Sequence, residues 1–132
     1  MTPAAEAKRY LAPMGYRIDF AVRDGTLRAV VSGKSSLAHA GSIARDIAEQ
    51  ASRQSTKQLL IDVRRLLGRV GTLGPMLEPQ GEMAGCRVAV LDVRDNDPYY
   101  VFSEDAARMR GRELRYFYDL AAALRWLDAS TD

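Results

Sequence analysis

The chain has 132 residues, of which 47% are hydrophobic and 27% are charged, and its formal net charge is +2. This length and composition are typical of one globular domain and exclude disorder over most of the chain. The small net charge gives no reason to expect nucleic acid or an acidic membrane as a partner.

The first fifteen residues are predicted to form an N-terminal tail or leader, followed by one domain over residues 16–129. Pro3, Pro13 and Gly15 surround the short patch Lys8–Leu11, a composition typical of irregular structure. No segment resembles a signal peptide or reaches the roughly 20 apolar residues of a membrane span. A soluble, cytoplasmic protein is therefore expected.

A β-hairpin is predicted next. Apolar and polar residues alternate from Tyr16 to Val22, as in a half-buried strand, and Asp24-Gly25 is a strong signal for a two-residue turn. Thr26–Ser32 then forms the second, antiparallel strand. From Ser36 the period changes to that of a helix, with an apolar stripe that runs through Ile43 and Ile47.

Two short, mainly apolar runs, Gln58–Val63 and Arg87–Val93, are predicted to be interior strands of a parallel sheet, because their apolar residues follow one another and suit burial on both faces. Each run has an aspartate near its end, Asp62 or Asp92. Between the runs, residues 72–85 have helical spacing interrupted by Pro79, which predicts a kinked or two-piece helix.

The C-terminal third is predicted to add a helix that begins at Ser103, a strand over Leu114–Tyr118 and a last helix capped by Asp119. The predicted fold is therefore α/β, a single domain with a mixed, mostly parallel five-stranded sheet, an antiparallel N-terminal edge strand and about four helices. The residues expected to be largely buried are Ile43, Ile47, Leu60, Val90, Phe117, Leu124 and Leu127. Cys86 is expected to be a buried structural thiol.

This element order resembles the STAS superfamily, in its SpoIIAA-like (STAS/CRAL-TRIO-like) bacterial branch. The segments that carry the resemblance are Gly25–Gly33 with the helix after it, Leu59–Val63, and Phe117–Leu127. The resemblance implies the SpoIIAA-like fold and a regulatory role like that of anti-sigma factor antagonists. In that family, the loop after the strand leads to a phosphorylated Ser or Thr at a helix N-terminus. Thr72 is the nearest match here, although Val70 stands where the family has an acidic residue.

The residue types needed for catalysis and metal binding are scarce. His39 is the only histidine and Cys86 the only cysteine, so neither a nucleophilic triad nor a zinc site is expected. No phosphate-binding glycine motif occurs. The sequence therefore predicts a protein that is not an enzyme, with no cofactor and no metal.

The segment after Leu59–Val63 is the first candidate binding site. It is a glycine-punctuated loop with nearby arginines, and the carboxyl ends of parallel strands are where α/β sheets bind ligands. It would bind an anion, a partner, or a phosphoryl group on Thr72; a plain connection with solvated arginines is the alternative. The candidate residues are Arg64, Arg65, Arg69, Gly71, Thr72 and Gly74.

The second candidate is an apolar cleft at the same end of the sheet. Its residues would be Met76, Met83, Tyr99, Tyr100 and Phe102, with Tyr116 and Tyr118. Methionines and aromatics at these spacings also commonly fill the interior of a protein.

The predicted function is that of a non-catalytic STAS-like module that acts through protein–protein contacts. The alternative is a carrier or sensor of a small apolar or lipid-like ligand. The expected partner is thus another protein or a small apolar molecule, with no nucleic acid and no membrane span, and a homodimer is compatible with the sequence.

Overall fold

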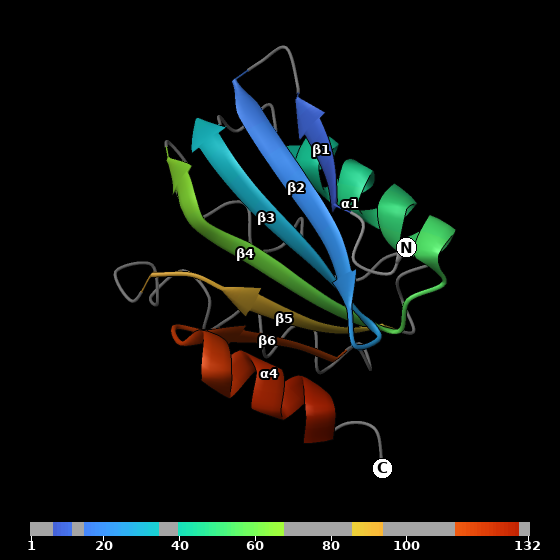
Figure 1. Cartoon of the computed structure of the whole chain (residues 1–132). Coiled ribbons are helices and arrows are strands. Elements are labelled where there is room, and N and C mark those ends of the chain that lie inside the picture. Colours follow the sequence, from blue (N-terminus) through green and yellow to red (C-terminus); the bar gives the residue numbers. More distant parts are fainter. Residues whose placement is uncertain (1–6, 12–14, 35–39, 68–85, 94–112, 130–132) are drawn as a thin grey trace.

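One mixed sheet forms the centre of the molecule in the computed structural model, which describes residues 7–11, 15–34, 40–67, 86–93 and 113–129. The described strands follow one another across the sheet in chain order (Figure 1). They are β1 (Ala7–Leu11), β2 (Tyr16–Arg23), β3 (Thr26–Lys34), β4 (Gln58–Leu67), β5 (Arg87–Leu91) and β6 (Glu113–Phe117). β2 is antiparallel to both of its neighbours, β1 and β3, and β3 to β6 are parallel.

The five predicted strands are confirmed, and β4 and β5 are interior as expected. The prediction for the N-terminus was wrong, because Ala7–Leu11 is a sixth strand that pairs with β2. The hairpin strand β2 is therefore not at the edge of the sheet. The adjacent charged residues Lys8 and Arg9 interrupt the alternation of apolar and polar residues that would indicate a strand. The strand conformation of this segment therefore depends on its pairing with β2.

The Asp24-Gly25 turn forms as predicted. Both residues have a positive φ, 52° for Asp24 and 79° for Gly25. A two-residue turn with both residues in this region matches the right-handed twist of the strands that it joins.

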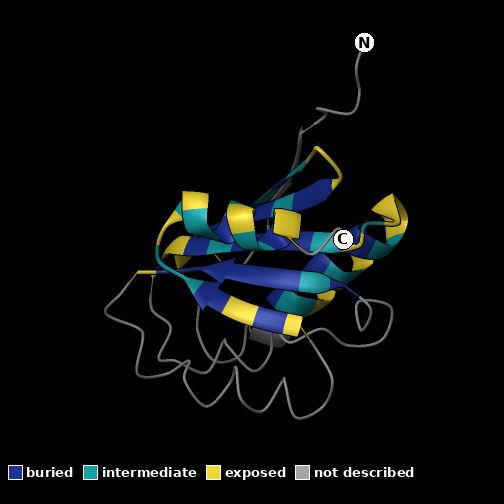
Figure 2. Cartoon of the chain, turned by 90° about the horizontal axis from the view of Figure 1, so that it is seen from below, coloured by how far each residue is buried: buried dark blue, intermediate teal, exposed yellow. Residues whose placement is uncertain are grey.

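Helix α1 (Ala40–Gln54) covers one face of the sheet and helix α4 (Leu120–Ala129) the other. Ile43 and Ile47 of α1 pack against strand residues such as Ile61, whereas Ala123 and Leu127 of α4 pack against Leu60, Ala89 and Leu91. Figure 2 shows the buried residues along the strands. The described helices thus lie on both faces, as predicted; the predicted helices over 72–85 and from Ser103 lie outside the described residues.

Five of the seven side chains expected in the core are buried, but the prediction was wrong for two. Phe117 and Leu124 are only partly buried and pack at the margin of the α4 core. Phe117 ends the edge strand β6, and its ring lies 5.6 Å from that of Trp126. Among the described strands, β6 pairs with β5 alone. The side chains that pack between this edge of the sheet and α4 are therefore not completely covered.

Candidate functional site

The carboxyl ends of β4 and β5 lie side by side, because Asp62 of β4 is the register partner of Leu91 in β5. Sequence reasoning placed Arg64 and Arg65 in a loop, and this was wrong. β4 continues to Leu67 by pairing its last residues with Ser32–Lys34 of β3. The candidate arginines therefore lie on a strand of fixed register.

A β-bulge bends β4 at this point. Val30 pairs with Asp62 and Ser32 with Arg65, so that two steps along β3 match three along β4. The extra residue explains why Val63 and Leu66 are both buried although they are three positions apart. A bulge redirects the side chains beyond it, and here it leaves Arg65 and Leu67 exposed.

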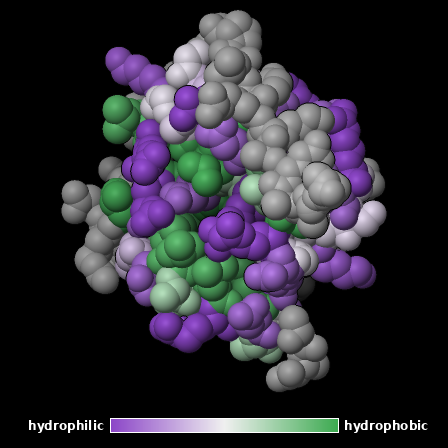
Figure 3. Space-filling view, viewed as in Figure 1, coloured by the Kyte–Doolittle hydropathy of each residue, from purple (hydrophilic) through white to green (hydrophobic). Residues whose placement is uncertain are grey.

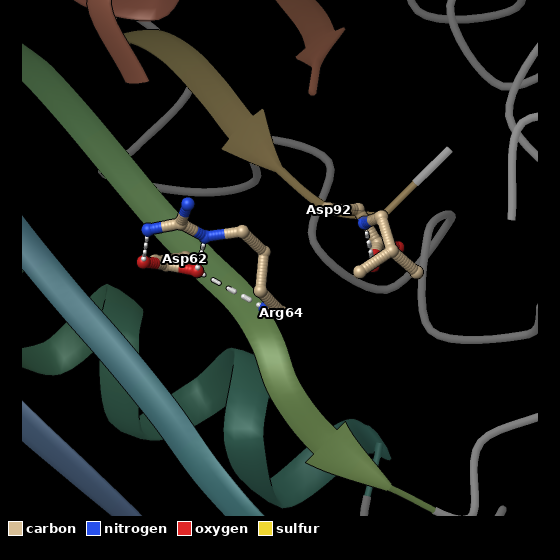
Figure 4. Close-up of polar contacts among 4 residues, drawn as sticks. Asp62, Arg64 and Asp92 are labelled. Atoms are coloured by element: carbon tan, nitrogen blue, oxygen red, sulfur yellow. Dashed lines mark hydrogen bonds and ion pairs between the residues drawn. The ribbon is translucent and has the colours of Figure 1, made fainter. Parts of the chain in front are cut away.

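Asp62 and Arg64 form a rigid pair on β4 (Figure 4). Asp62 Oδ1 accepts hydrogen bonds from Arg64 N at 3.1 Å and Nε at 3.0 Å, while Oδ2 accepts one from Nη2 at 2.9 Å. The hydrogen bond with Asp62 raises the pKa of the Arg64 guanidinium further above its ordinary value, against a smaller opposite effect of burial. Bidentate geometry of this kind fixes the orientation of the guanidinium.

Asp92 directly follows β5 and is completely buried. Its Oδ1 accepts a hydrogen bond from Val93 N at 2.7 Å, and its backbone N–H donates to Phe117 O at 2.9 Å. Asp92 thus ties the end of β5 to β6 and directs the chain outward, so that Val93 is exposed.

Two large hydrophobic side chains are exposed among the described residues, and both lie at this end of the sheet. Leu67 at the end of β4 is 65% exposed, and Val93 just after β5 is 41% exposed. The exposed side chains of Arg64 and Arg65 lie on the same stretch of β4. We call Arg64, Arg65, Leu67 and Val93 the carboxyl-end surface.

The structure places few of the other predicted site residues. Tyr116 is buried in the core on the α1 side, which contradicts a role in an open cleft, and Tyr118 is half-buried. Leu67 and Val93 were not predicted as site residues, and no local signal distinguishes them. Leu67 follows the apolar Leu66, which is buried, and Val93 ends a run predicted to be an interior strand. The following predicted site residues lie outside the described part of the chain: Arg69, Gly71, Thr72, Gly74, Met76, Met83, Tyr99, Tyr100 and Phe102.

The opposite end of the sheet has a structural role. Cys86 is buried, as expected, and its thiol donates to Thr56 O at 3.2 Å; burial raises the pKa of this thiol. Nearby, the Arg87 guanidinium lies 4.0 Å from the centre of the Trp126 ring and pairs with Glu113. These contacts hold the C-terminal end of α4 against the sheet.

Two further observations concern only the described ranges. No three His, Cys, Asp or Glu side chains there gather as they would around a metal ion. No described helix is long and apolar enough to cross a bilayer.

The comparisons with known proteins support the fold. No protein-family model and no curated protein matches the chain. Among solved structures, the chain is similar to an anti-sigma factor antagonist from Mycobacterium paratuberculosis, with a TM-score of 0.61 and 20% identity over 90% of this chain and 99% of that one. The SpoIIAA-like fold implied by the sequence resemblance is therefore confirmed, and at this identity the likeness concerns the fold alone.

Proposed function

We propose that this chain is a non-catalytic regulatory module that binds another protein through the carboxyl-end surface. The observation that carries the proposal is the exposure of Leu67 and Val93 at the ends of neighbouring strands, beside exposed arginines. Apolar side chains with a polar rim are the usual anatomy of a protein interface. The bulge in β4 and buried Asp92 support this role, because they hold the exposed residues on rigid backbone.

The kind of partner is proposed from the fold. The structurally similar mycobacterial protein is an anti-sigma factor antagonist, so an anti-sigma factor is the first class of partner to test. We include the segment with Arg69, Gly71, Thr72 and Gly74 in the surface, since it directly follows Leu67 in the chain. A phosphoryl group on Thr72 would add up to about two negative charges beside the arginines and change the fit of a partner.

The test uses the tagged full chain, purified from its own host and analysed by native mass spectrometry. The variants Leu67→Ser and Arg65→Glu should each reduce retention of the partner by about tenfold or more, because each removes a central interface contact. Thr72→Glu tests the adjoining segment in the same assay. Arg53→Glu on α1 is the matched control. Arg53 is an exposed arginine outside the carboxyl-end surface, and its described ion pair is with the exposed Glu49 on the same helix.

Thermal unfolding of each variant shows whether the fold is intact. Loss of the partner at unchanged stability, with Arg53→Glu like the wild type, supports the proposal. Equal retention by wild type, Leu67→Ser and Arg65→Glu would overturn it. Retention of a small apolar molecule in place of a protein would also overturn it, in favour of a ligand carrier.

A further inference from the structure

One face of the sheet is only partly covered by the described helices. α4 reaches Leu60, Ala89 and Leu91 on this face, and Figure 1 shows it along β5 and β6, with no described helix in front of β2 and β3. We call the part of this face that no described helix covers the open sheet face. Its residues are Arg17, Asp19, Ala21, Arg28, Val30, Ser32, Asp62 and Arg64.

The strand period places these residues on the face opposite α1. They alternate with core residues such as Ile18, Val31 and Ile61, which are completely buried on the α1 side. Among the residues of the open sheet face, all but the exposed Arg64 are half-buried. Figure 3 shows hydrophilic side chains in the middle of this view of the molecule, bordered by hydrophobic ones.

The two carboxylates on the open sheet face already have partners on their own strands. Arg17 Nε lies 3.2 Å from Asp19 Oδ2, and Arg64 Nη2 lies 2.9 Å from Asp62 Oδ2. Neither carboxylate is therefore needed to neutralise a third arginine.

Arg28 is that third arginine. It lies on β3 between its register partners Ala21 and Leu60, and it is half-buried. Within the part of the chain that the structure describes, its side chain makes no hydrogen bond or ion pair. A guanidinium keeps its charge in proteins and is seldom buried without an acidic partner.

The margins of the face are basic as well. β2, β3 and β4 together contain six basic residues and two acidic ones. The basic residues are Arg17, Arg23, Arg28, Lys34, Arg64 and Arg65. An acidic partner would be attracted to this excess of positive charge.

We propose that the open sheet face binds an acidic amphipathic segment of a partner protein, with a carboxylate on Arg28 and apolar side chains on Ala21 and Val30. Bidentate pairing would satisfy the fork of the guanidinium. A nucleic acid fits less well, because the apolar side chains of Ala21 and Val30 offer no contact for its phosphates. The open sheet face shares Arg64 with the carboxyl-end surface, but Arg28, Ala21 and Val30, on which this proposal rests, lie outside that surface, so the two proposals are tested independently.

The probe is a short synthetic helical peptide with leucines on one face and glutamates on the other. Its fluorescence anisotropy is measured with the full chain. The wild type should bind it saturably, and Arg28→Gln should weaken binding by about tenfold, as loss of a partly desolvated charge pair does. Val30→Glu, which places a carboxylate beside Arg28, should weaken binding as well. Arg45→Gln, which alters an exposed arginine on α1, should leave affinity unchanged.

The same peptide with lysine in place of glutamate should not bind. The variant Leu67→Ser should bind the acidic peptide as the wild type does, and this result separates the proposal from the one on the carboxyl-end surface. Thermal unfolding controls for folding. Equal affinity of the folded variants Arg28→Gln and Val30→Glu and the wild type would overturn the proposal. So would no binding of the acidic peptide, or preferential binding of single-stranded DNA at this face.

Discussion

Gly33 lies where the end of β3 passes the beginning of β2, as the register partner of Tyr16. Its φ is 98°, and a Cβ added there would lie 2.4 Å from the carbonyl oxygen of Gly15. The backbones are held this close by a hydrogen bond of 2.9 Å from Lys34 N to Gly15 O. A glycine at this position is therefore required for both conformation and space.

The variant Gly33→Ala should lower the free energy of unfolding by about 1–3 kcal/mol from positive φ alone, and by more if the backbones must separate. Gly25→Ala is the control, because its φ is 79° but an added Cβ meets nothing within 4 Å. Urea denaturation should show the larger loss for Gly33→Ala. Equal losses of unfolding free energy in the two variants would contradict an added cost from the close approach of the two backbones at Gly33.

At the scale of elements, α4 is held at both ends by side chains from outside its own span. At the N-terminus, Ala122 N donates to Asp119 Oδ2 at 3.1 Å, the predicted cap. At the C-terminus, Gln58 Nε2 donates to Leu127 O at 2.6 Å, and Arg87 Nη2 lies 3.5 Å from Trp126 O. A guanidinium at this end also complements the helix dipole.

The two leucines of α4 should differ in their effect on stability. Leu127 is 1% exposed, so Leu127→Ala should cost about 2–5 kcal/mol of unfolding free energy, as large-to-small core substitutions do. Leu124 is half-buried, so Leu124→Ala should lower the free energy of unfolding by clearly less. Its position in the apolar stripe had predicted an equal loss. Chemical denaturation followed by circular dichroism compares them. A larger loss for Leu124→Ala would contradict the observed docking of α4.

At the scale of the whole molecule, the sheet joins two hydrophobic cores. Leu59 and Ile61 of β4 face the α1 core, and Leu60 between them faces the α4 core. Since β4 and β5 contribute to both cores, neither core can open without disturbing the strands that form the other. The described part of the chain should therefore unfold as one cooperative unit.

Trp126, the single tryptophan, reports this coupling, because it packs at the margin of the α4 core. Ile47→Ala alters the opposite core and should cost about 2–5 kcal/mol. If the molecule is one cooperative unit, Ile47→Ala should lower the midpoint of unfolding measured by Trp126 fluorescence by the same amount as the midpoint measured by circular dichroism. A tryptophan midpoint that stays at the wild-type value would show that the two cores unfold separately.

The sequence by itself determined the order of the described elements from Tyr16 onward, the hairpin turn, the two interior strands and the cap of the last helix. Each depends on local signals: alternation from Tyr16 to Val22, the Asp24-Gly25 pair, continuous apolar runs, and Asp119 before an apolar stripe. Such signals act over a few residues, so they are present in the chain before it folds. The order of elements also predicted that the candidate surface would lie at the carboxyl ends of the parallel strands.

The tertiary structure alone decided which residues form the surfaces. β1 is a strand because β2 offers it an edge, and Arg64 and Arg65 lie on β4 because β3 pairs past a bulge. Arg28 appears in the sequence as an ordinary polar position in an alternating strand, and its half-burial without a described partner follows from Ala21 and Leu60 on the neighbouring strands. Strand pairing and burial depend on residues far apart in the chain, so no local pattern could specify them.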